Sequence, residues 1–164
     1  DFQLKNLAMA VKAAKLCALK EKRIYKALKN IKDVDGRLEL TRELSNKIKV
    51  FIDYAHTPDA LLKTLLYLKK NHRSAINLVF GCGGDRDKKK RKFMAKIAND
   101  NCKKVYVTDD NPRNEDPKKI RDHLLKHIAK NKALNIGSRE LAIKTAIQNA
   151  NPNKIVLSAG KGLI

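Results

Sequence analysis

The sequence contains no tryptophan, and only 5% of its residues are aromatic. No apolar run approaches the length of a transmembrane helix, so we expect a chain that does not span a membrane. No secretory signal opens it, and its three cysteines, Cys17, Cys82 and Cys102, form no CxxC pair. An odd number of unpaired cysteines favours free thiols in a reducing cytoplasm over a disulfide framework.

Two chemical motifs are also missing. The phosphate-binding pattern G-x-x-x-x-G-K-[ST] does not occur, and the Gly160-Lys161-Gly162 run lacks its spacing and its hydroxyl. His123 and His127 are four residues apart, but Leu124 stands where a zinc protease has glutamate, and no third ligand is apparent. We therefore expect the pair on a solvated helix face and predict no metal site.

The net charge of +20 raises the hypothesis of nucleic-acid binding. Lys and Arg are nevertheless spread evenly, with 13, 11 and 11 in the first three stretches of 50 residues. One dense cluster, residues 88–92, has no aromatic neighbour except Phe93, which fits the core face of its helix. Solvated helix faces explain the excess better, so we expect weak, salt-sensitive binding to polyanions and no specific nucleic-acid partner.

With 164 residues, 43% of them hydrophobic, the chain can form one domain and part of another. Segments of helical period alternate with short apolar runs, which lie at residues 50–52, 76–80, 105–108 and 155–159. This alternation predicts an α/β fold, a Rossmann-like, mostly parallel sheet with helices on both faces. Loops that follow the carboxyl ends of parallel strands gather at one edge, where ligands bind.

The first part of the chain lies outside this alternation. Residues 3–19 and about 21–30 have helical period, and a turn follows at residues 34–37. We therefore place a domain boundary near residue 37, with residues 1–36 as the tail of a preceding domain. Near the other end, residues 132–136 are expected to form a short strand and residues 138–150 a helix.

The most informative loop is Asp109-Asp110-Asn111-Pro112-Arg113, directly after the third apolar run. Asp110 can accept from an ammonium group, and Arg113 offers a planar fork that suits a carboxylate. Together they suit a ligand with a positive and a negative end, such as an amino acid. The alternative is a turn with a surface ion pair.

The loop after the first run places Asp53 and His56 three residues apart. They either contact the ribose or base of a nucleotide or serve only capping and turn formation. Thr57 or Asp59 can cap the helix that follows, and Pro58 suits its first turn.

The loop after the second run is rich in glycine. Residues 81–84 read Gly-Cys-Gly-Gly, which lets the backbone approach a ligand closely, and Arg86 follows as an anion-binding group. Cys82 is interpreted as a small residue in a tight turn rather than a reactive thiol.

These loops, in this order, resemble the carboxyl-terminal domain of the Mur ligases, the ATP-dependent amide ligases of peptidoglycan assembly, and among them the members that add meso-2,6-diaminopimelate. The matching motifs are DYAHTPDAL (53–61), FGCGGDRDKKKR (80–91), TDDNPR (108–113) and AGKG (159–162). The resemblance extends back through residues 36–39 and the first helix. The DNPR loop is its specific part, since members that add lysine carry a different residue in place of the arginine.

The resemblance implies two sets of site residues and no catalytic residue within this chain. The set implied for diaminopimelate is Arg86, Asp110, Asn111, Pro112, Arg113 and Gly160. The set implied for ATP is Asn6, Arg37, Asp53 and His56.

The resemblance also implies an activity and its cofactors. Such ligases phosphorylate the glutamyl carboxylate of UDP-MurNAc-L-Ala-D-Glu, and an amine of diaminopimelate then attacks the acyl phosphate. ATP and Mg²⁺ are held mainly by a central domain, of which residues 1–36 resemble the last helices. Residues 37–164 resemble the carboxyl-terminal domain of a cytoplasmic, monomeric enzyme.

One departure from the family concerns the last two residues. The family continues Gly-Lys-Gly with His-Glu, whose glutamate holds the distal end of diaminopimelate, whereas this sequence has Leu163 and Ile164. We therefore interpret the chain as a truncated ligase that is inactive alone. The alternatives are a basic α/β module that binds nucleic acid and a small-molecule-binding domain without catalysis.

Overall fold

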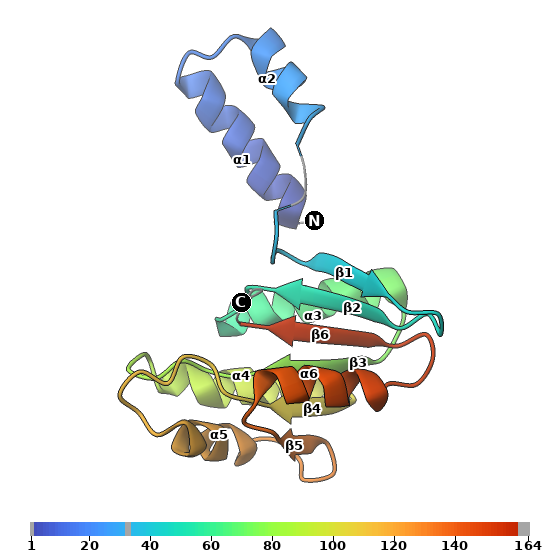
Figure 1. Cartoon of the computed structure of the whole chain (residues 1–164). Helices are drawn as coiled ribbons and strands as arrows, with labels where there is room; N and C mark the ends of the chain where they lie inside the picture. The colour runs from blue at the N-terminus through green and yellow to red at the C-terminus, as the bar shows by residue number, and fades with distance from the viewer. Residues whose placement is uncertain (1, 32–33, 161–164) are drawn as a thin grey trace. The chain divides into compact units, whose positions relative to one another are not determined.

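The structure is a computed structural model that describes residues 2–31 and 34–160, with side chains from residue 4 onward (Figure 1). Leu163 and Ile164, where the sequence departs from the family, lie outside the described residues. The chain divides into two compact units, Asp1–Asp33 and Val34–Ile164. None of the helices in the described ranges is long and apolar enough to cross a membrane.

The first unit contains helices α1 (Phe2–Leu16) and α2 (Glu21–Leu28), both shorter than predicted. Helix α1 ends early because Ala18 adopts a left-handed conformation with φ of +59° and its amide donates to Lys15 O. Among the described side chains of this unit Ile24 is the buried apolar one, whereas several others of similar size are exposed, namely Leu4, Met9, Leu16 and Ile31.

The second unit is built on a six-stranded sheet in the order β1-β2-β6-β3-β4-β5. Its strands are β1 (Glu39–Glu43), β2 (Lys49–Asp53), β3 (Ile76–Phe80), β4 (Lys104–Val107), β5 (Ala133–Asn135) and β6 (Ile155–Ala159). All neighbouring pairs from β2 to β5 are parallel, which confirms the predicted mostly parallel sheet. The antiparallel edge strand β1 escaped prediction because it is largely exposed and has no apolar run.

Helices cover both faces of the sheet, as predicted. Helices α3 (Pro58–His72), α4 (Lys89–Asn101) and α5 (Pro117–Leu125) share one hydrophobic cluster with Leu78 and Phe80. Helix α6 (Arg139–Gln148) packs with Val79 on the opposite face (Figure 1). Adjacent residues of β3 thus point to opposite faces, and both faces are buried.

The prediction that Phe93 lies on the core face of its helix is wrong, because its side chain is 57% exposed. The buried stripe of α4 is instead Arg91, Met94, Ala95 and Ala98, which follow helical spacing. An arginine can begin this stripe because a carboxylate from another loop neutralises it, as described below.

Candidate functional site

The unusual loops gather at the carboxyl edge of the sheet. Strands β2, β6, β3 and β4 are adjacent and parallel, so their carboxyl ends lie on one side (Figure 1). The four loops that the sequence singled out therefore neighbour one another. They begin at Tyr54, Gly160, Gly81 and Thr108, in their order across the sheet.

The glycine loop makes room for the neighbouring loop. A Cβ atom on Gly81 would lie 2.3 Å from Thr108 O, and one on Gly84 would lie 1.8 Å from Pro112 O. The Gly84 amide also donates to Asn111 O at 2.8 Å. The sequence predicts a ligand close to these glycines, whereas the group that approaches Gly81 and Gly84 is the backbone of the loop after β4.

A buried ion pair fastens the same two loops together. Both terminal nitrogens of Arg91 donate to the carboxylate of Glu115, at 3.0 and 2.8 Å, and Nη2 also donates to Gly83 O at 3.2 Å. The Asp85 amide donates to Glu115 at 2.7 Å. A paired fork of this kind fixes geometry as well as charge, so it sets the position of the loop after β4 relative to the glycine loop.

The hydrogen bonds from Arg91 and from the Asp85 amide lower the pKa of Glu115 from 4.5 to about 2. Because its folded pKa lies below the unfolded value, Glu115 stabilises the fold fully above pH 4.5, and this contribution is lost as the pH falls towards 2. We expect the unfolding free energy of Glu115→Gln, measured by urea titration, to vary less between pH 5 and pH 2 than that of the wild type. The same substitution at exposed Glu140 should keep the wild-type acid dependence, and an unchanged profile in Glu115→Gln would contradict the assignment.

The loop after β4 is also shaped by its own side chains. Asp110 Oδ1 accepts from the Asn111 amide at 2.7 Å, and Asn111 Oδ1 accepts from the Arg113 amide at 3.2 Å. Arg113 is exposed and left-handed, with φ of +49°, and its Nη1 donates to Gly84 O at 2.7 Å. Its Nε and Nη2 atoms bond to no other described residue, so the guanidinium retains donors for an anion.

Asp110 lies beside Gly160, at the end of β6. A Cβ atom on Gly160 would lie 3.3 Å from Asp110 Oδ2, and Gly160 has φ of +98°. A glycine lets the end of β6 approach the Asp110 side chain, which is mostly shielded from solvent. Arg86, in contrast, is exposed and makes no hydrogen bond or ion pair within the described part of the chain. Asp110 and Gly160 thus lie against each other, and Arg113 follows in the same loop as Asp110.

Residues of the second predicted set lie near the end of β2, and the Gly160 amide joins this end to the first set by donating to Asp53 O at 3.0 Å. The guanidinium of Arg37 lies 4.7 Å from the centre of the Tyr54 ring, which contacts the His56 ring edge-on at 4.9 Å. Asp53 is buried and accepts from the Ala55 amide at 2.7 Å. Burial raises the pKa of Asp53, although this hydrogen bond opposes the shift.

Local structure gives the same group a role in turn formation. Thr57 is the residue that caps α3, accepting from the Ala60 amide at 3.3 Å, with Pro58 in the first turn. His56 Nδ1 lies 3.0 Å from Tyr54 O, so its ring is held by its own loop. Asn6 lies on α1 in the first unit and is exposed.

Cys82 and the histidine pair do not have the features of a reactive thiol or a metal site. Cys82 is buried against Met94, and burial raises its thiol pKa to about 11, which agrees with a small residue in a tight turn. Helix α5 ends at Leu125, so His127 lies beyond it, with its ring 6.0 Å from that of His123. Among the residues that the structure describes, no group of three metal-ligating side chains occurs.

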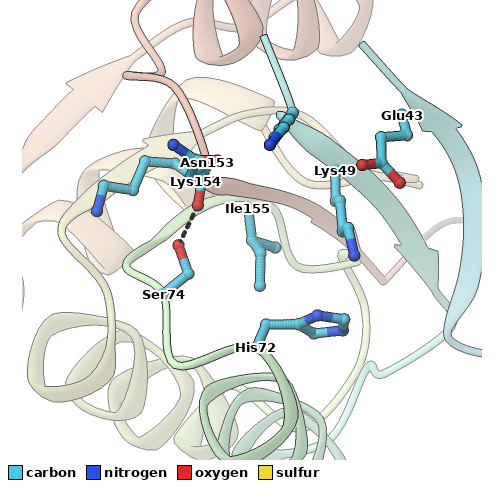
Figure 2. A pocket seen from close by; sticks show the side chains of 8 residues that line it. Glu43, Lys49, His72, Ser74, Asn153, Lys154 and Ile155 are labelled. Carbon is cyan, nitrogen blue, oxygen red and sulfur yellow. Dashed lines mark hydrogen bonds between the residues drawn. The ribbon is translucent and has the colours of Figure 1, made fainter. Parts of the chain in front are cut away.

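A cavity of about 220 Å³ lies at the opposite edge of the sheet, where β2 and β6 begin. Its lining consists of Glu43, Lys47, Lys49, His72, Ser74, Asn153, Lys154 and Ile155 (Figure 2). None of these belongs to the predicted site residues. Ser74 Oγ donates to Asn153 O at 2.6 Å, and burial together with Lys49 lowers the pKa of His72.

Comparison with known proteins agrees with this arrangement. The family profile described as "Mur ligase, glutamate ligase domain" matches residues 36–162. The chain belongs to the Mur ligase family. Its relatives include the UDP-N-acetylmuramoyl-L-alanyl-D-glutamate–2,6-diaminopimelate ligases of Rickettsia bellii and Chelativorans, which are 44% and 40% identical over 99% of this chain. These matches confirm the resemblance stated from the loop motifs.

Solved structures show the same fold. A UDP-N-acetylmuramoyl-L-alanyl-D-glutamate–2,6-diaminopimelate ligase matches 98% of this chain and 33% of its own length, with a TM-score of 0.71 and 36% identity. The UDP-N-acetylmuramate-alanine ligase of Thermotoga maritima matches 97% of this chain and 34% of its own length, with a TM-score of 0.69 and 20% identity, which shows the fold alone. The chain spans about a third of the length of the curated relatives it matches.

Sequence reasoning missed one ion pair and one further arginine of this Mur ligase domain. The Arg91–Glu115 pair joins residues 24 positions apart, and Arg139 ion-pairs with Asp110 from the start of α6. The signal available for Arg91 was its place on the buried stripe of α4, three residues before Met94. For Arg139 the sequence offers no comparable signal, because this helix residue has its partners at the ends of two strands, β4 and β6.

Proposed function

We propose that this chain is the carboxyl-terminal part of an ATP-dependent ligase that adds meso-2,6-diaminopimelate to UDP-MurNAc-L-Ala-D-Glu in peptidoglycan synthesis. Its task is to bind the incoming amino acid and to close over ATP, and it is inactive alone. The observation that carries the proposal is that the Asp110 carboxylate lies against Gly160, while Arg113 in the same loop as Asp110 keeps free donors.

The chemistry of this edge suits an amino acid. An ammonium group suits the Asp110 carboxylate beside Gly160, and a carboxylate suits the free donors of Arg113. Asn111 and Pro112 hold the loop between them, and Arg86 is assigned as a second anchor for a carboxylate. Positioning an amine near an acyl phosphate converts a bimolecular attack into an effectively unimolecular one.

We assign Arg37, Asp53 and His56 to contacts with ATP, and Asn6 to a contact with the adenine of ATP. Mg²⁺ and most contacts with ATP belong to parts of the ligase that this chain does not span.

We assign residues 1–36 to the last helices of the central ATPase domain, where their exposed leucines and methionine pack against the rest of that domain. Residues 37–164 swing on the connection near residue 37 as the site closes. The whole enzyme is proposed to act as a cytoplasmic monomer.

Internal contacts weaken the rival hypothesis of a nucleic-acid-binding module. Within the dense basic cluster, Arg91 is buried against Glu115, and Lys88 lies 3.6 Å from the same carboxylate. Lys90 donates to His56 O at 3.1 Å. Three of the five basic side chains therefore have partners within the protein, which leaves few for phosphates.

The direct test uses the complete ligase, meaning this chain joined to the domains that its relatives carry and it does not span. We expect ADP release that depends on both UDP-MurNAc-L-Ala-D-Glu and meso-diaminopimelate, with formation of the tripeptide product measured by chromatography. Lysine, which lacks the distal carboxylate, should serve far less well. No product with diaminopimelate, or equal rates with lysine, would refute the proposed substrate.

A further inference from the structure

Arg139, the first residue of α6, is not among the residues assigned above. Ser138 caps this helix by accepting from the Leu141 amide at 3.2 Å, which fixes where the helix begins. The Arg139 side chain lies at the carboxyl edge of the sheet and is only 10% exposed.

The guanidinium of Arg139 connects the ends of β4 and β6. Its Nε donates to Asp109 O at 3.3 Å, and its Nη1 donates to Ala159 O at 3.3 Å and to Ser158 Oγ at 3.5 Å. In the sheet, β4 and β6 are separated by β3. One side chain thus spans the two strand ends that carry Asp110 and Gly160.

The remaining nitrogen, Nη2, is buried and has no hydrogen-bond partner among the described residues. Its ion-pair partner is Asp110, whose Oδ2 lies 3.9 Å away. Burial lowers the pKa of the Arg139 guanidinium, and the carboxylates of Asp110 and Asp109 oppose this shift. An arginine stays protonated in proteins, so a fixed positive charge lies behind the Asp110 carboxylate.

The same carboxylate oxygen also lies next to the end of β6. A Cβ atom at Gly160 would lie 3.3 Å from Asp110 Oδ2, 3.7 Å from Gly81 O and 3.9 Å from Ala55 O. Oδ2 therefore lies close to both a buried cation and the backbone of Gly160. Because Nη2 has almost no accessible surface, Arg139 cannot itself contact a ligand and must act through Asp110.

We propose that Arg139 is a positioning residue that holds the Asp110 carboxylate in place and directs it at the ammonium group of the incoming amino acid. The inference rests on the proposed function and extends it to a residue outside the ligand-contacting loops. A buried cation with a donor that no described residue satisfies is costly for folding, and this role beside Asp110 accounts for that cost.

The test is a double-mutant cycle in the complete ligase, measured through KM for meso-diaminopimelate and KM for ATP. We expect Arg139→Gln to raise KM for diaminopimelate about tenfold and to change KM for ATP less than about twofold. In an Asp110→Asn background, adding Arg139→Gln should change KM for diaminopimelate by less than about twofold, because the group through which it acts is already neutral. Arg139→Lys, which keeps the charge, should recover part of the loss and replaces Arg139→Gln if that variant does not fold.

The matched control is Arg121→Gln, which removes an arginine that pairs with the neighbouring carboxylate of Asp109 and with Asn135. It changes the charge equally but does not touch Asp110, so KM for diaminopimelate should stay within about twofold of the wild type. Equal effects of Arg139→Gln with and without Asp110, or a parallel rise in KM for ATP, would show a merely structural role and overturn the inference. A wild-type ligase without diaminopimelate-dependent ADP release would instead refute the proposed function itself.

Discussion

Replacing Arg113 by alanine in the complete ligase is expected to raise KM for meso-diaminopimelate by about 10- to 100-fold. A charge-assisted hydrogen bond contributes about 1.5–3 kcal/mol, and each 1.4 kcal/mol corresponds to a factor of about ten. The variant loses the donors that Arg113 leaves free and its bond to Gly84 O. Steady-state kinetics with diaminopimelate varied at saturating ATP measures the effect, and an unchanged KM would remove the assignment of Arg113.

Arg73→Ala is a closely matched control for this variant. Arg73 is also exposed and left-handed, with φ of +47° against +49° for Arg113, so both substitutions place alanine in the same strained conformation and remove the same charge. Arg73 follows α3 near the cavity at the amino edge of the sheet, away from the loop after β4. The KM of Arg73→Ala for diaminopimelate should equal that of the wild type. This comparison separates the effect of losing the Arg113 donors from the effects of backbone strain and of net charge.

Gly84→Ala is expected to lower the unfolding free energy of the chain by about 1–3 kcal/mol, as is typical of overpacked sites. The added Cβ atom would lie 1.8 Å from Pro112 O and 2.6 Å from Pro112 C, so backbone rather than a flexible side chain must move. The movement displaces the loop that carries Asp110 and Arg113, and KM for diaminopimelate should rise with it. Urea unfolding of the chain and kinetics of the complete ligase measure the two effects.

Gly83→Ala separates the two effects of Gly84→Ala. The atom nearest to a Cβ on Gly83 is Nη1 of Arg113, at 2.9 Å, which is the end of a flexible side chain. We expect stability within about 0.5 kcal/mol of the wild type but a raised KM for diaminopimelate, because the guanidinium shifts. Equal unfolding free energies of Gly84→Ala and Gly83→Ala would contradict the prediction. They would mean that the close contact between the glycine loop and the loop after β4 does not require glycine at position 84.

The sequence predicted the local elements well because local periodicity and local capping create them. The buried runs of β3 and β6, the cap at Thr57 and the alternation of strands and helices all follow from residues close together in the chain. The same reasoning failed for β1, whose stability comes from pairing with β2 rather than from its own composition. Phe93 was misplaced because the buried stripe of α4 starts at an arginine, and a charged side chain is not expected on a core face unless its partner Glu115 is known.

For the candidate site, the sequence by itself determined the loops, their chemistry and, through the order of their motifs, the Mur ligase family. Only the tertiary structure decided how the loops are held: by close contact at Gly81 and Gly84, by the Arg91–Glu115 pair and by Arg139 behind Asp110. These partners are separated by about 20 to 30 residues in the chain, and the strand order alone brings them together. Side-chain composition is written along the chain, whereas the pairing of charges across neighbouring loops exists only after the sheet has formed.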